Sequence, residues 1–417
     1  ALTMVGAVNL SDDVLTGVSQ ITLVDATSTV LTLSQAQFDT LGAANLVAVN
    51  TNPAQVPTLN LVGFGSAPFD ATTVDADINV GTITLVPGNV TLNPATNLTG
   101  VDAIIVPDGG VLNLTAAQFQ QLQGFGAINA ANPAHTFTVN ITGLTQADVD
   151  AGFNLSLIGT TGVETITVSL GQPTVNLGTF NTAGALVTGS AAVLNNADFV
   201  LAANQTLGLV NYAQANGLDV TGGANSTIIF KFQPFGFPIA DQIDASGYDV
   251  TVLKALANSF TTASTLGSAN VEYVIDGLPS AVELRLYEDP ASLGFLDPTF
   301  RKVVIEAGVS TPVGLIFNDT DLTDEVRTLS LTLEGGSTLS GNLAIPTFIK
   351  APGLVQRYFD TLTIHSEGAT GNTIAGSIVP VTAFALENNI LKVVIDGSAN
   401  LTIAGDIVFN KVGDNNA

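Results

Sequence analysis

The chain alternates apolar and small polar residues over many short segments. Residues 20–24 read QITLV, residues 136–141 read TFTVNI and residues 165–168 read TITV. A period of two that uses Thr and β-branched residues is typical of half-buried β-strands. The pattern therefore predicts an all-β chain built from many short strands.

Three segments interrupt the alternation and predict short helices. Residues 34–37 read SQAQ and residues 115–118 read TAAQ, each followed by Phe and, three residues later, by Leu. Ser or Thr with Gln three residues on is a capping box. We expect one short helix at 34–41 and one at 115–122, packed over one end of a stack of strands, and a further helix that begins near Thr145.

An internal repeat organises the first half of the chain. Residues 15–41 resemble residues 98–122, and Val30 to Leu41 aligns without a gap on Val111 to Leu122. The spacing of roughly 80 residues is that of a small domain. We expect tandem β-repeats of solenoid or sandwich type with short capping helices. The units are 1–97 and 98–184, followed by a decayed third repeat or connector at 185–230, where Ala197-Asp198-Phe199 stands in place of AQF.

A β-rich C-terminal domain is expected over residues 231–417. Residues 328–333 read TLSLTL and residues 391–395 read LKVVI, and Gly-containing turns such as Asp396-Gly397 close these strands. Short strands separated by such turns are typical of a sandwich or a solenoid.

The distribution of charge supports a boundary between these halves. The 417 residues carry a formal net charge of −25, and no Lys or Arg precedes Lys231. Residues 1–230 hold 14 acids and no base, whereas residues 231–417 hold 21 acids and ten bases. So acidic a protein repels phosphate backbones and anionic lipid, so we expect no nucleic-acid partner.

Cysteine is absent, which removes disulfides, thiolate metal sites and Cys nucleophiles together. We expect secretion to an extracellular or cell-surface location without help from disulfides. Neither end shows a signal peptide or an apolar run that could span a bilayer, and Ala1-Leu2-Thr3 would suit a processed terminus.

Candidate catalytic groups are few and scattered. The only histidines are His135 and His365, and no G-x-S-x-G elbow is present. A β-helix enzyme acting on acidic polysaccharide would need Arg or Lys, which the repeat region lacks. A glycosidase would need two carboxylates, for which Asp75 with Asp77 or Asp148 with Asp150 could serve. We interpret these acids as loop residues, and we expect no catalytic residue and no enzymatic activity.

Calcium binding explains clustered acidic residues better than catalysis does, since this hard cation binds carboxylate, amide and carbonyl oxygens. No EF-hand loop and no G-G-x-G-x-D array occurs in the sequence. The candidate calcium ligands lie in two acidic segments: Asp319, Asp321, Asp324 and Glu325, and Asp75 with Asp77.

Three segments carry a resemblance to a known class of protein: VLNLTAAQF at 111–119, IDASG at 243–247 and LKVVIDGSANLTI at 391–403. The sequences of these segments resemble those of the cysteine-free, Thr/Ala/Gly/Asn-rich proteins of Gram-negative surface layers (S-layers) and related RTX-type secreted repeat adhesins. The resemblance implies β-rich domains that tile into sheets or filaments, commonly with calcium and after type I secretion. The chain departs from that class by lacking the calcium-binding nonapeptide repeats.

Together these features favour a non-enzymatic extracellular structural protein that self-assembles into a surface layer, sheath or filament through edge-strand pairing and apolar patches. Its expected partner is itself, and cell-surface polysaccharide is a further candidate partner. One alternative is an adhesin that binds a cell-surface glycan or protein. The other is a β-helix enzyme that degrades polysaccharide.

Overall fold

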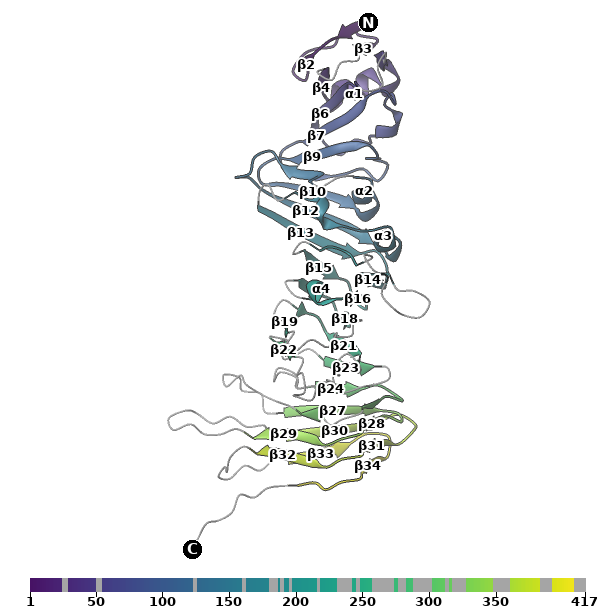
Figure 1. Cartoon of the computed structure of the whole chain (residues 1–417), viewed down its shortest axis with the longest axis vertical. Coiled ribbons are helices and arrows are strands. Elements are labelled where there is room, and N and C mark those ends of the chain that lie inside the picture. Colours follow the sequence, from purple (N-terminus) through teal and green to yellow (C-terminus); the bar gives the residue numbers. More distant parts are fainter. Residues whose placement is uncertain are drawn as a thin grey trace, which may run out of the picture. The chain divides into compact units, whose positions relative to one another are not determined.

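The computed structural model, whose helices and strands are labelled in Figure 1, has two compact units, Ala1–Val200 and Leu201–Ala417. Strands make up 49% of the interpretable residues and helices 11%, so the predicted β-rich fold is confirmed. The boundary between the two units follows Val200, whereas the charge distribution predicted a boundary near Lys231. The structure describes residues 1–24, 29–49, 55–122, 126–159, 163–179, 187, 191–194, 197–215, 218–230, 242–244, 248–256, 274–276, 283–287, 302–311, 315–316, 328–347, 361–382 and 392–408.

Unit 1 contains three sheets whose strands pair in parallel. The first has the order β1 (Leu2–Met4), β3 (Ile21–Val24), β5 (Leu46–Val49). The second, the β2–β11 sheet, has the order β11 (Ile128–Ala130), β9 (Val101–Val106), β7 (Asn79–Leu85), β6 (Thr58–Phe64), β4 (Val30–Ser34), β2 (Ala7–Asn9). The third, the β8–β15 sheet, has the order β15 (Asp198–Leu201), β13 (Val163–Leu170), β12 (Thr136–Leu144), β10 (Gly110–Thr115), β8 (Asn89–Thr91). Strand β14 (Thr174–Asn176) follows β13 in the chain.

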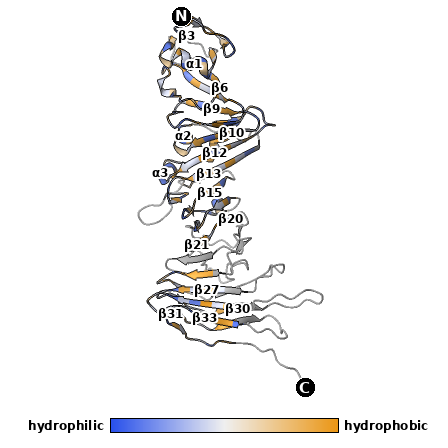
Figure 2. Cartoon of the chain, turned by 180° about the vertical axis from the view of Figure 1, so that it is seen from behind, coloured by the Kyte–Doolittle hydropathy of each residue, from blue (hydrophilic) through white to orange (hydrophobic). Residues whose placement is uncertain are grey.

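The predicted alternation explains how these sheets form a core. In the β8–β15 sheet, Leu112, Val139 and Ile166 are register partners on successive strands, and each is at most 3% exposed. Parallel pairing without a register shift places residues of the same kind beside one another on neighbouring strands. Apolar residues therefore line the interior, while Thr and Asn face outward. The alternation along these strands can be followed in Figure 2.

The three predicted helices are confirmed, each with a capping box. They are α1 (Gln35–Leu41), α2 (Ala116–Gln120) and α3 (Gln146–Asp150). In α2 the Gln118 N–H donates to Thr115 Oγ1, and Gln118 Oε1 accepts from the Thr115 N–H, both at 3.1 Å. Helix α2 ends at Gln120, two residues before the predicted end, yet Leu122 is still buried. Short 3-10 turns add η1 (Ala43–Asn45), η2 (Ala71–Thr73) and η3 (Leu155–Leu157).

Helices α1 and α2 are held to their surroundings in the same way. The side-chain amide of Gln37 donates to the carbonyls of Leu10 and, at 2.7 Å, of Asp13. The side-chain amide of Gln118 donates to the carbonyls of Asn93, at 2.7 Å, and Thr96, at 3.2 Å. A carboxylate could accept the capping hydrogen bond but could not donate these two, which explains why both boxes use Gln rather than Glu.

Each of these helices also buries one Phe against a second aromatic ring. The rings of Phe38 and Phe69 lie 5.5 Å apart, and those of Phe119 and Phe153 also lie 5.5 Å apart. Phe69 directly precedes Asp70, which caps η2, and Phe153 precedes Asn154, which caps η3. The local likeness between the two segments thus extends beyond the residues matched in the sequence.

The alignment of Ala197-Asp198-Phe199 with the helical AQF segments is wrong at this point. These residues enter strand β15, where Asp198 is the register partner of Thr167. A helix with a similar cap occurs further on, at α4 (Tyr212–Ala215). There the Gln214 N–H donates to Asn211 Oδ1 at 2.9 Å, and Gln214 Oε1 accepts from the Val210 N–H.

Unit 2 is also built from parallel strands. Within it the main sheet, here called the β16–β33 sheet, has the order β16 (Thr206–Leu209), β18 (Thr227–Phe230), β21 (Val252–Leu256), β23 (Glu283–Tyr287), β24 (Lys302–Ile305), β27 (Thr328–Glu334), β30 (Thr361–Glu367), β33 (Lys392–Asp396). Strand β17 (Asp219–Gly222) pairs in parallel with β20 (Tyr248–Asp249), and β19 (Gln242–Asp244) pairs in parallel with β22 (Val274–Asp276). Two further sheets have the orders β25 (Ser310–Thr311), β28 (Thr338–Leu339), β31 (Asn372–Ile374), β34 (Leu401–Ile403), and β26 (Leu315–Ile316), β29 (Leu343–Thr347), β32 (Ile378–Thr382).

The interior of unit 2 follows the same rule as that of unit 1. Val303, Leu331 and Ile364 are successive register partners and are fully buried. Residues one position along the strand, such as Thr332 and His365, face outward. The outward face of the β16–β33 sheet therefore displays polar side chains such as Thr332 and His365.

Candidate functional site

Ionisable side chains gather on the outward face of the β16–β33 sheet. Lys254 on β21 forms an ion pair with Glu306, which follows β24, with 2.6 Å between Nζ and Oε1. His365 and Glu367 lie on β30, and Asp396 lies on β33. The scattered titratable residues of the sequence are thus partly brought together by the parallel stacking.

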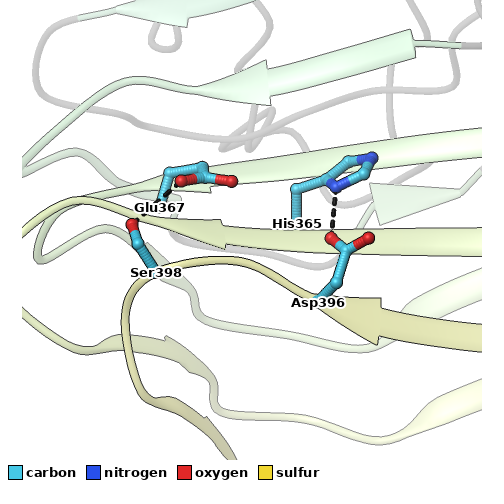
Figure 3. Close-up of polar contacts among 4 residues, drawn as sticks. All are labelled: His365, Glu367, Asp396 and Ser398. Atoms are coloured by element: carbon cyan, nitrogen blue, oxygen red, sulfur yellow. Dashed lines mark hydrogen bonds and ion pairs between the residues drawn. The ribbon is translucent and has the colours of Figure 1, made fainter.

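His365 and Asp396 form the centre of this candidate site. They are register partners on β30 and β33, and His365 Nδ1 contacts Asp396 Oδ1 (Figure 3). The His365 side chain is 35% exposed and that of Asp396 52% exposed. Both groups are accessible from solvent, so the contact is a surface hydrogen bond that becomes an ion pair when the imidazole is protonated.

A second contact lies beside the first. Ser398, in the turn after β33, donates its hydroxyl to Glu367 Oε2 at 2.9 Å (Figure 3). The Ser398 hydroxyl also accepts from the Gly368 N–H at 3.2 Å. A nucleophilic serine needs its hydroxyl on the base, but here the hydroxyl is directed to Glu367 rather than to His365. The four residues form two polar cross-strand pairs and not a triad.

The chemistry open to this arrangement is surface recognition. Carboxylates, an imidazole and a hydroxyl can bind polar or cationic groups, and exposed pairs do not provide the water-excluded setting that catalysis favours. Within the part of the chain that the structure describes, no group of three or more His, Cys, Asp or Glu residues is arranged to hold a metal ion.

Asp75 and Asp77, two of the predicted calcium ligands, are close in space, and Asp75 has a structural role. Asp75 Oδ2 accepts from the Ala48 N–H at 3.1 Å, and Asp75 Oδ1 accepts from the Asp77 N–H at 3.1 Å. The carboxylate of Asp75 thereby satisfies a backbone donor of β5. Calcium binding by this pair stays a prediction.

The other predicted calcium ligands, Asp319, Asp321, Asp324 and Glu325, lie outside the described residues. The alternative glycosidase pair, Asp148 with Asp150, belongs to helix α3. Asp148 Oδ2 accepts from the Thr145 N–H at 2.9 Å, and Asp150 Oδ1 accepts from the Thr179 hydroxyl at 2.9 Å. Both carboxylates hold local structure.

The sequence singles out His365 as one of two histidines but does not by itself identify its partner. A signal was present, because residues 362–365 read LTIH and residues 393–396 read VVID. Aligning these two strands as parallel neighbours places His365 opposite Asp396. That step needs the parallel pairing, which alternation alone does not specify.

Comparison of the chain with protein-family models, with curated proteins and with solved structures gives no match. In the described part of the chain, the helices are too short or too polar to cross a membrane.

Proposed function

We propose that the chain is a non-enzymatic extracellular structural protein that assembles with copies of itself into a surface layer, sheath or filament. Its framework would be a parallel β-solenoid. The observation that carries the proposal is the parallel pairing of strands that follow one another through each sheet, as in the order β2, β4, β6, β7, β9, β11. A chain that coils in this way adds one strand to the same sheet with each coil.

The repeat hypothesis supports the same proposal. Units 1–97 and 98–184 would be homologous, with a decayed third copy at 185–230. In their favour, α1 and α2 share a capping box, a Gln amide that donates to two backbone carbonyls of the preceding segment, and a buried pair of Phe rings. Repeats that stack on their neighbours form extended scaffolds, which suits a mechanical role.

The composition supports an extracellular setting and a role for salt. A cysteine-free chain with a net charge of −25 resembles surface-layer proteins, and its copies repel one another at low ionic strength. Calcium would screen and bridge the carboxylates, in keeping with the predicted use of Asp75 and Asp77.

Glycan binding is a second candidate function, favoured by the outward face of the β16–β33 sheet. His365, Glu367 and Asp396 display hydrogen-bonding groups together there. An adhesin would use this face to hold a cell-surface polysaccharide, and a polysaccharide-degrading enzyme would use it to cleave one. Loss of polysaccharide retention in His365→Ala with Asp396→Ala would favour the adhesin, and release of reducing ends by the wild-type chain would favour the enzyme.

Sedimentation velocity of the purified chain tests the structural proposal. We expect large species whose share grows with protein concentration and with calcium, and that decline when a chelator is added at low ionic strength. A monomer at every concentration, with or without calcium, would contradict self-assembly.

A further inference from the structure

We infer that the outward face of the β8–β15 sheet is a contact surface between copies of this chain. The inference rests on the proposed self-assembly and names the surface that it uses. The central row of this face runs across five strands in register: Thr91, Asn113, Asn140, Thr167 and, at its margin, Asp198.

The side chains of this face are held in fixed positions before any partner arrives. Asn140 Nδ2 donates to Asn113 Oδ1 at 2.8 Å, and Asn113 Nδ2 donates to Asn89 Oδ1. The amides form a ladder across β8, β10 and β12. Ordered side chains lose less conformational entropy on association, so this face is prepared for contact.

The charge of unit 1 identifies the partner. Residues 1–200 contain 13 acids and no base. On β8, β10, β12 and β13 the outward positions hold uncharged residues, mainly Thr, Ser and Asn. Glu164, the acid of β13, is the register partner of the inward-facing Phe137, so it lies off this face. Two acidic copies repel each other wherever carboxylates face carboxylates, and across these four strands they can approach without that repulsion, with Asp198 at the margin on β15. A basic partner would instead be drawn to the acids elsewhere.

The size of the face suits repeated weak contacts. Seven residues from Thr136 to Thr142 extend about 20 Å along β12, and five strands span about 19 Å, so the face offers roughly 400 Å² per copy. A stable pairwise interface buries about 800 Å² per partner. One such contact is therefore weak, and it holds copies together in an array where each copy makes several contacts.

A pair of charge insertions with a matched control tests this surface. Thr138→Glu with Thr167→Glu places two carboxylates on the outward face. Thr22→Glu with Thr32→Glu makes the same change at half-buried outward positions of the other two sheets of unit 1. We expect the first variant to need at least tenfold more protein for assembly in sedimentation velocity, and the control less than twofold more. Unchanged far-UV circular dichroism and thermal midpoints show that both variants fold.

A second measurement avoids any effect of the inserted charge. Because the chain has no cysteine, Thr167→Cys and Thr32→Cys each introduce one thiol for a short thiol-reactive cross-linker. We expect covalent dimers from Thr167→Cys in the assembled protein and few from Thr32→Cys. Equal assembly of both charge variants, or equal cross-linking at both sites, would overturn this surface while leaving self-assembly intact. The same holds if the first charge variant assembles normally but no longer binds a neutral polysaccharide that the wild type retains. A wild-type chain that never associates would remove the proposed function and this inference together.

Discussion

The Gln118 side chain allows a sharp test of how the short helices are attached. Gln118 is 3% exposed, and it both accepts a capping hydrogen bond and donates to the carbonyls of Asn93 and Thr96. The substitution Gln118→Glu keeps the shape and the acceptor but removes both donors. It also directs a carboxylate toward two carbonyl oxygens in a segment without any basic residue.

The expected loss follows from these contacts. The Asn93 carbonyl keeps the Thr96 N–H as a donor, at 2.8 Å, whereas the Thr96 carbonyl loses the donor from Gln118. A buried acceptor left without a donor costs about 1–3 kcal/mol, and an unpaired buried charge costs about 3–5 kcal/mol. These effects overlap, so we expect Gln118→Glu to destabilise the segment by about 3–5 kcal/mol at pH 7. Burial and the facing carbonyls would raise the folded-state pKa of the new carboxyl above its usual value of about 4.3. The loss should therefore shrink as the pH falls toward 4, where the protonated acid donates again.

Gln121→Glu is the matched control. Gln121 Oε1 accepts from the Leu98 N–H at 2.7 Å, a role that a carboxylate keeps. We expect a change within about 0.5 kcal/mol. Hydrogen exchange followed by mass spectrometry over residues 93–122 gives the local opening free energy, which suits a chain whose repeats need not unfold in one step. A loss below about 1 kcal/mol for Gln118→Glu at pH 7, or an equal loss for both variants, would refute the reasoning.

Three further predictions concern other parts of the chain. Gly397 has φ +121°, and an added Cβ would lie 2.1 Å from the Ser366 carbonyl oxygen. Gly397→Ala should therefore destabilise the β30–β33 pairing by about 1–3 kcal/mol, measured as faster hydrogen exchange in residues 392–396. Gly65→Ala is the control, because the space around its added Cβ is open, and it should leave hydrogen exchange around residue 65 unchanged. Calcium should raise the thermal midpoint, and Asp75→Asn with Asp77→Asn should reduce that shift; an undiminished shift would exclude this pair as the site. Trypsin should leave a large N-terminal fragment that ends at or beyond Lys231, because no Lys or Arg precedes it; mass spectrometry that finds smaller tryptic pieces of residues 1–230 would refute this.

Local sequence signals predicted the elements of this fold well. The capping boxes at Ser34, Thr115 and Thr145 each open a helix, since the side chains that satisfy the first turn lie within four residues of one another. Alternation likewise identified β12 and β13 as strands, because burying one face imposes a period of two.

Contacts between distant residues were beyond those signals. Ala197-Asp198-Phe199 shares letters with the helical AQF segments, yet pairing of Asp198 with Thr167 places it in a strand. The carboxylate of Asp75 serves Ala48, 27 residues earlier in the chain. His365 contacts Asp396 because β30 and β33 pair in parallel with these two residues as register partners. Alternation fixes which face a side chain occupies but not which strand lies beside it.

Electron microscopy of the purified chain tests self-assembly most directly. Specimens prepared with calcium, and with a chelator at low ionic strength, should be compared at equal protein concentration. We predict ordered sheets or filaments in the first and fewer or none in the second. Dispersed single molecules in both specimens, at concentrations where the protein is folded, would contradict the structural role.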